Sequence, residues 1–163
     1  MIRRLTLCLT VPALLLAACA RPSLTPAELN KARVRQMIQE LDNAPSAEVV
    51  ARWLTSDYQL FMNGAPAMDL AGYQSMVKET TASFSNIKHD IHHLVAEGDT
   101  VAVGVTLHLT HTGVFDGIAA TGRTITVEEF SVMRIRDGKV ATEWAVVDLG
   151  GLRQQLSAPP PKG

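Results

Sequence analysis

The chain has 163 residues and a formal net charge of −1. This length suits one domain with short appendages, and an apolar fraction of 47% is too low for a protein with several membrane spans. The near-neutral charge leaves no basic footprint, so we expect no nucleic-acid partner.

The first 18 residues have the three-part pattern of a secretory signal peptide. A pair of arginines, Arg3-Arg4, is followed by an apolar stretch from Leu5 to Leu16, which is too short for a stable membrane anchor. The ending Leu-Ala-Ala-Cys resembles the bacterial lipobox, in which the cysteine is acylated. We therefore expect a lipoprotein signal peptide over residues 1–18, a tether over 19–24 and lipid on Cys19. A plain signal peptide that is cleaved nearby is the alternative.

This interpretation places the protein in the cell envelope, attached to the membrane through its lipid. Ala20 is not the aspartate that retains many lipoproteins at the inner membrane, so we expect the outer membrane, with the domain facing the periplasm. Cys8 and Cys19 are the two cysteines of the chain. The processed domain would then contain no disulfide and no cysteine nucleophile.

Helical signals fill the first half of the remaining chain. Thr25 as N-cap, Pro26 in the first turn and Glu28 as the partner in a capping box start a helix that runs to about Asn43. A second helix is expected over about 46–54, and residues 57–62 form an irregular segment or a short strand. Asp69 caps a third helix, whose apolar face consists of Leu70, Tyr73, Met76, Val77 and Phe84.

Beyond Asn86 the hydrophobic period changes from helical to two, which indicates strands. One face of the first strand is expected to carry Ile87, His89, Ile91, His93 and Val95. Residues 101–109 alternate most regularly, and Asp137-Gly138 favours a type I′ turn between two long strands. Helices followed by antiparallel strands predict an α+β domain over residues 25–157, with a Pro-rich tail over 158–163.

Several short motifs in fixed order resemble the SnoaL-like polyketide cyclase (ester cyclase) group of the nuclear transport factor 2-like superfamily. The resemblance implies a cone-shaped barrel, made of a strongly bent antiparallel sheet wrapped by three N-terminal helices around an apolar cavity. It also implies an intramolecular aldol reaction without metal or organic cofactor, and homodimerisation across the open sheet face, as is common in this superfamily. The motifs are Ala96-Glu97-Gly98-Asp99, Thr110-His111-Thr112-Gly113, Ala120-Thr121-Gly122, Arg134-Ile135, Asp137-Gly138-Lys139, Glu143-Trp144, Asp148 and Leu152-Arg153-Gln154-Gln155-Leu156.

The chain departs from the family at three polar positions. In the cyclases an acidic residue on the last strand serves as acid and base, and the corresponding residue here is Ala145. A histidine on the preceding strand assists, where this chain has Ser131. Many relatives also have a histidine after an Asp-Tyr pair, where Gln59 follows Tyr58. The resemblance therefore implies the fold more strongly than the cyclase activity.

Glu129 and Glu143 are the candidates for a catalytic acid or base. Glu129 shares strand parity with apolar residues, so it would face the interior, where burial raises the pKa of a carboxyl. Alternatively, Glu128-Glu129 straddles a bulge and both side chains are solvated. Glu143 shares parity with Ala145 and reaches the same cavity, or it lies on the surface.

A small apolar molecule is the expected ligand. Among the residues expected to line its cavity, Val127, Met133 and Trp144 should be largely buried, although methionines serve equally well as core filler. The expected ligand contacts are Tyr58, Phe61, Met76, Val127, Ser131, Met133, Trp144 and Ala145.

The histidines do not predict a metal site. His92 and His93 are adjacent on a strand and should point to opposite faces, while His89 and His93 share a face but lie about 13 Å apart. A pair of His93 with His108 lacks a third ligand. His111 is expected to hydrogen-bond its own loop, and Asp148 to cap the closing segment.

Two functions remain open at this point. Because Ala145 replaces the usual base, the sequence favours a lipid-anchored envelope protein whose cavity binds a small hydrophobic ligand without cyclase activity. The alternative is a divergent cyclase-like enzyme that uses a cavity carboxylate as general acid and base.

Overall fold

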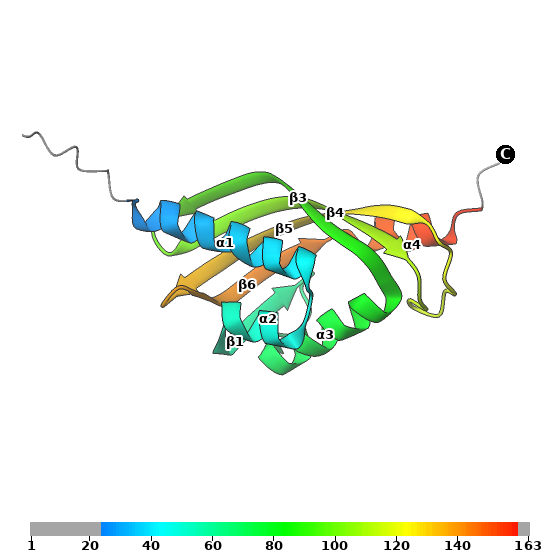
Figure 1. Ribbon diagram of the computed structural model, residues 1–163, viewed down its shortest axis with the longest axis horizontal. Helices are drawn as coiled ribbons and strands as arrows, with labels where there is room; N and C mark the ends of the chain where they lie inside the picture. Colours follow the sequence, from blue (N-terminus) through cyan, green and yellow to red (C-terminus); the bar gives the residue numbers. More distant parts are fainter. Residues whose placement is uncertain (1–23, 160–163) are drawn as a thin grey trace, which may run out of the picture.

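The structure is a computed structural model that describes residues 24–159. Within these residues the chain forms four helices and six strands, arranged as one curved sheet with helices on its inner side (Figure 1). In chain order the elements are α1 (Pro26–Asn43), α2 (Ala47–Trp53), β1 (Leu54–Met62), β2 (Met68–Asp69), α3 (Leu70–Ser83), β3 (Phe84–Glu97), β4 (Thr100–His111), β5 (Thr124–Arg136), β6 (Lys139–Val147) and α4 (Leu149–Ser157).

The sheet has the strand order β2-β1-β6-β5-β4-β3. The expected α+β class with a bent sheet and three N-terminal helices is confirmed, with two differences in detail. The sheet is open, and it is mixed, because β1 runs parallel to β6 while the other pairs are antiparallel. The segment expected to be irregular or a short strand over 57–62 belongs to the nine-residue strand β1.

Each helix begins with a side chain that accepts a backbone hydrogen bond from the residue three positions later. The accepting residues are Thr25, Ser46, Asp69 and Asp148, with donor–acceptor distances of 2.8–3.3 Å. Such caps satisfy backbone groups that would otherwise lack partners at a helix start. The expected cap of the closing helix by Asp148 is confirmed. Glu28 pairs with Lys31 at 2.7 Å.

The inner face of the sheet forms the main core together with α1. Val34, Met37 and Ile38 of α1 pack on the strands, and all three are almost fully buried. Their partners on the sheet include Val101, Val103, Val105, Met133, Ile135 and Val140. Helix α4 lies near the other end, where Leu152 and Leu156 cover Ile125 and Val127 (Figure 1).

A bulge in β3 changes the face that its second half presents. The pairing of β3 with β4 shifts register between Ile91 and His93, so His93 and Val95 face outward rather than continuing the inner row of His89 and Ile91. The expectation that these residues share one face is therefore wrong, as is the expectation that His92 and His93 point apart. Their Nδ1 atoms lie 2.6 Å from each other.

Gly104, opposite His93 on β4, leaves room for two aromatic rings on the outer face. A Cβ atom at Gly104 would lie 2.7 Å from a ring carbon of Phe130 and 2.9 Å from one of His92. Any larger residue would displace these rings, which cover the backbone on the outer face. The β5–β6 hairpin turns as expected, since Asp137 and Gly138 have φ of 52° and 79°.

The expected signal peptide, lipobox and tether fall almost entirely on residues 1–23, which lie outside the described residues, as does most of the Pro-rich tail. Within residues 24–159 no helix is both long enough and apolar enough to cross a membrane.

Candidate acid/base site

Glu129 faces the interior of the curved sheet. Strand β5 pairs with β4 without a register shift from Thr100↔Arg134 to Thr110↔Thr124, so there is no bulge at Glu128-Glu129. The parity argument is therefore confirmed, and the alternative with two solvated carboxylates is wrong. Glu129 accepts a hydrogen bond from the Ser131 hydroxyl at 3.1 Å.

Glu143 lies on the same inner face, on the neighbouring strand. It is 6% exposed, and its Oε2 atom accepts a 2.7 Å hydrogen bond from the Tyr58 hydroxyl. Tyr58 reaches it because β1 runs beside β6, where Leu60 pairs with Glu143. Ser131 and Ala145, which pair with each other across β5 and β6, lie between the two glutamates. The two carboxyls therefore flank the position at which the family is expected to have its base.

Burial raises the pKa of both carboxyls. Burial is the largest cause of the raised pKa of Glu129, and the charge of Glu143 raises it further. The hydrogen bond from Ser131 lowers it, and the resulting pKa is about 7. Burial also raises the pKa of Glu143, against the hydrogen bond from Tyr58. Burial and the nearby Glu143 raise the pKa of the Tyr58 hydroxyl, so Tyr58 stays protonated and acts as a donor.

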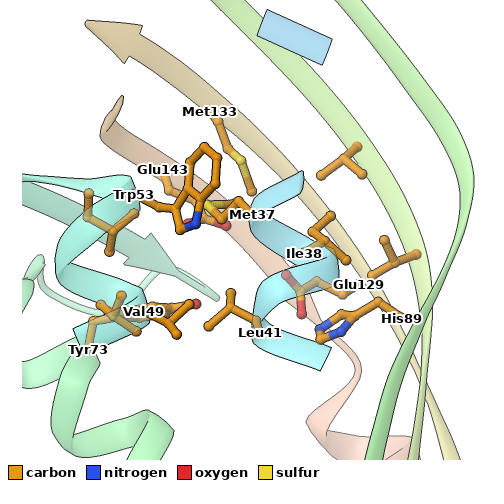
Figure 2. Close-up of a pocket in the computed structure, with 14 residues that line it drawn as sticks. Met37, Ile38, Leu41, Val49, Trp53, Tyr73, His89, Glu129, Met133 and Glu143 are labelled. Atoms are coloured by element: carbon orange, nitrogen blue, oxygen red, sulfur yellow. The ribbon is translucent and has the colours of Figure 1, made fainter. Parts of the chain in front are cut away.

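The glutamates line a cavity between the sheet and helices α1, α2 and α3. A larger lobe of about 320 Å³ and a smaller one of about 40 Å³ share five lining residues. Figure 2 shows side chains around the smaller lobe, with Glu129 and Glu143 reaching in from the sheet. The five shared residues are Leu41, Tyr73, His89, Glu129 and Glu143.

The chemistry of the lining restricts what the cavity can accept. The larger lobe is mostly apolar, and none of the described residues that line either lobe is a lysine or arginine. An anionic molecule would lose its hydration and meet two acidic groups, at a high cost in free energy. A volume of about 320 Å³ is at the lower end of the range for ligand sites. The cavity therefore suits a small, neutral, largely apolar molecule.

Two aromatic residues on the list of expected ligand contacts lie outside the cavity. Trp144 is 42% exposed and stacks on Phe61 on the outer face, with ring centroids 6.0 Å apart. The expectation that Trp144 is buried is wrong, because its neighbours Glu143 and Ala145 both face inward and a strand alternates its sides. The other six expected contacts lie on the inner side; Met76, Val127 and Ala145 line the larger lobe and Met133 the smaller one.

Sequence reasoning missed two polar groups of the cavity. Tyr73 of α3 lines both lobes and meets Tyr58 edge-on, with ring centroids 5.6 Å apart. His89 also lines both lobes, and its Nδ1 lies 2.6 Å from Asp42 of α1. The signal for His89 was its parity with Ile87 and Ile91. No sequence pattern near Asp42 indicated that it would pair with His89, which lies 47 positions further along the chain.

The remaining histidines have structural partners. His111 is fully buried, and its Nδ1 contacts the Thr121 hydroxyl at 3.1 Å and accepts the Thr121 N–H at 3.3 Å, which confirms the expected bond to its loop. His108 contacts Asp90 on the outer face at 3.0 Å instead of pairing with His93. Within residues 24–159 no three His, Cys, Asp or Glu side chains are grouped so that they could hold a metal ion.

Comparison with known proteins places these features in a wider context. The sequence model of the family described as SnoaL-like polyketide cyclase matches residues 32–156. A search of curated proteins finds no match. Among solved structures, a protein described as a SnoaL-like polyketide cyclase from Jannaschia sp. CCS1 has a TM-score of 0.75 and 19% identity, over 86% of this chain and 100% of that one.

Two further solved structures differ in the reactions given to them. A protein described as a polyketide cyclase from Acidithiobacillus ferrooxidans has a TM-score of 0.71 and 25% identity, over 82% of this chain and 97% of that one. AclR from Streptomyces galilaeus, described as a hydroxylase, has a TM-score of 0.72 and 23% identity, over 80% of this chain and 97% of that one. One fold thus hosts different named activities, so the reaction must be argued from the site.

Proposed function

Because this chain belongs to the SnoaL-like polyketide cyclase family, we propose that it is an acid/base enzyme acting on a small, neutral, largely apolar carbonyl compound. The reaction class is removal of a proton from the carbon next to the carbonyl group, followed by bond formation at that carbon. The observation that carries the proposal is the pair of inward-facing carboxyls of Glu129 and Glu143, which line one cavity and accept hydrogen bonds from Ser131 and Tyr58.

Glu129 is the base in this proposal. Its pKa of about 7 leaves a substantial fraction ionised near neutral pH, and the same shift makes it a stronger proton acceptor than an ordinary glutamate. The Ser131 hydroxyl fixes one carboxylate oxygen and leaves the other free to take the proton.

Glu143 and Tyr58 stabilise the oxygen of the substrate. When Glu129 takes the proton, negative charge develops on the carbonyl oxygen, and a protonated Glu143 donates a hydrogen bond to it. Tyr58 holds Glu143 through its 2.7 Å bond, so the donor is oriented before the reaction starts. The raised pKa of Glu143 favours the protonated form that this role requires.

Binding of a small hydrophobic ligand without turnover is the second candidate. The observation that favours this binding role is Ala145, which occupies the family's usual acid/base position and cannot transfer a proton. Two carboxyls beside Ala145 favour the enzyme instead, since a purely apolar ligand gains nothing from two buried acids.

Exchange of α-hydrogens separates the two candidates. The purified protein is incubated with cyclohexanone in D₂O, and deuterium incorporation is followed by NMR. We expect catalysed exchange that falls at least about 100-fold in Glu129→Gln. Glu128→Gln is the matched control, because Glu128 is the adjacent exposed residue and bonds Thr106 on the outer face. Exchange that is absent, or equal in both variants, would favour the binding protein.

We also propose that the protein is anchored in the cell envelope through lipid on Cys19. The expected location is the outer membrane, with the domain facing the periplasm. The support is the lipobox-like sequence that ends at Cys19. Cys19→Ser should abolish labelling with a radioactive fatty acid and leave unprocessed precursor or a differently cleaved product. Unchanged labelling would exclude this anchor.

Homodimerisation through the outer face of the sheet is a further proposal. Phe130, Trp144 and Val146 are 52%, 42% and 65% exposed and lie on the same face. Such a contiguous apolar surface is typical of an interface. Val146→Asp should shift the purified protein toward monomer in sedimentation equilibrium. Val114→Asp, at an equally exposed residue away from this face, should not.

A further inference from the structure

The Asp42–His89 pair lies at the wall of the cavity, and the function proposed above gives it no role. The Nδ1 atom of His89 lies 2.6 Å from one Asp42 oxygen, and the His89 backbone N–H donates to the other at 3.3 Å. Both side chains are mostly buried, with 19% and 12% exposure. These two contacts fix the histidine ring against the end of α1.

The geometry turns the other ring nitrogen toward the cavity. With Nδ1 held by Asp42, Nε2 is the atom that can exchange a proton, and it makes no hydrogen bond to any of residues 24–159. His89 lines both lobes of the cavity. Figure 2 shows its ring and the Glu129 carboxyl directed into the same space.

The strand pairing places His89 and Glu129 on the same inner face of the sheet, on strands that are not direct neighbours. His89 pairs with Leu107, which pairs with Val127, whereas Glu129 pairs with Val105. His89 on β3 and Glu129 on β5 are thus separated by β4, which puts their strands about 10 Å apart. Along β5, Glu129 is the next inward-facing residue after Val127, which is level with His89. Both side chains nevertheless line the same two lobes of the cavity.

We propose that His89, positioned by Asp42, is a second proton-transfer group of the cavity and acts as the general acid opposite Glu129. This inference rests on the proposed function and adds a further catalytic residue to it. A base for a carbon acid and a separate acid for an oxygen suit the intramolecular aldol reaction that the family resemblance implies, in a neutral molecule with two carbonyl groups.

The proton balance of this ring closure is complete within the cavity. Glu129 takes a proton from the carbon next to the first carbonyl group. That carbon then forms a bond to the carbon of the second carbonyl group, whose π electrons move to its oxygen. The oxygen takes the proton from Nε2 of a protonated His89 and becomes a hydroxyl. Glu129 ends protonated and His89 neutral, and return of one proton from Glu129 to His89 through solvent restores the starting state.

The probe for this proposal is 2,6-heptanedione, a neutral diketone that can undergo the same ring closure. In D₂O, NMR measures two rates on this one compound: α-deuteration, which needs Glu129, and ring closure, which also needs His89. We expect both rates to be catalysed by the natural protein and both to be lost in Glu129→Gln. His89→Gln should keep α-deuteration within about threefold and lose ring closure at least about 100-fold.

Two variants separate catalysis from general support of the fold. Asp42→Asn should resemble His89→Gln, with retained α-deuteration and slower ring closure, because the imidazole is no longer held by a carboxylate. His108→Gln removes a His–Asp pair of the same kind on the outer face, next to Asp90. We expect it to leave both rates unchanged. Retained α-deuteration in the His89 and Asp42 variants also shows that each is folded.

The outcomes distinguish this inference from the function on which it rests. If the natural protein catalyses neither rate, the proposed function fails and the role of His89 fails with it. If α-deuteration depends on Glu129 but ring closure is unchanged in His89→Gln, the proposed function stands and the role of His89 is refuted. If His89→Gln lowers both rates equally, His89 supports the cavity without transferring a proton, which also refutes the proposal.

Discussion

Replacing Glu129 by glutamine should stabilise the protein, and more so at higher pH. Folding raises the pKa of this carboxyl from an ordinary value of 4.5 to about 7. The folded state therefore holds a proton that the unfolded state releases between these pH values. Linkage requires that the free energy of unfolding falls as pH rises through this window. The stability is fully present below pH 4.5 and is lost as pH rises through about 7.

The magnitude follows from the two pKa values. A pKa difference of this size makes the natural protein less stable by about 1 kcal/mol at pH 5 and about 3 kcal/mol at pH 8 than if the group stayed neutral. Glutamine keeps the shape and cannot ionise, so Glu129→Gln should recover these amounts. Loss of an acceptor for the Ser131 hydroxyl is not expected, because the glutamine amide oxygen can replace the carboxylate oxygen.

Urea denaturation at pH 5 and pH 8, followed by circular dichroism, measures the two free energies. Glu128→Gln on the outer face should change stability by less than about 0.5 kcal/mol at either pH. A gain from Glu129→Gln that is no larger at pH 8 than at pH 5 would mean that Glu129 is solvated. The same result would remove the basis for its role as a base.

Three other substitutions test separate parts of the structure. Trp144→Ala should cost about 1–2 kcal/mol in urea denaturation, since Trp144 stacks on Phe61 at the surface, whereas a loss of about 3–5 kcal/mol would place it in the core. Tyr58→Phe should destabilise the protein by about 1–3 kcal/mol and slow α-hydrogen exchange, because it leaves the buried Glu143 without its 2.7 Å donor. An unchanged free energy of unfolding and an unchanged exchange rate would contradict this contact. Ala145→Asp should lower stability and not raise turnover, because a third carboxyl would lie between two others; higher turnover would show that the family's usual base position still governs the reaction.

The sequence by itself determined the elements that depend on neighbouring residues. Thr25, Asp69 and Asp148 cap helices through side chains only three residues from their partners. The Asp137-Gly138 turn needs positive φ at both residues, and these residue types tolerate it. The motif order was enough to identify the family, and the alternation along β5 was enough to direct Glu129 inward. Trp144 was misplaced although its inward-facing neighbours already implied the outer face.

Tertiary structure decided how distant residues meet. The bulge at His92-His93 could not be read from the alternation, because it is a property of how β3 pairs with β4. The bond from Tyr58 to Glu143 joins residues 85 positions apart.

Asp42 and His89 lie 47 positions apart, and they meet because α1 packs across the inner face of β3 and β4. The sequence indicates which strand face a side chain occupies. Only the packing of helices on the curved sheet determines which side chains then share the cavity.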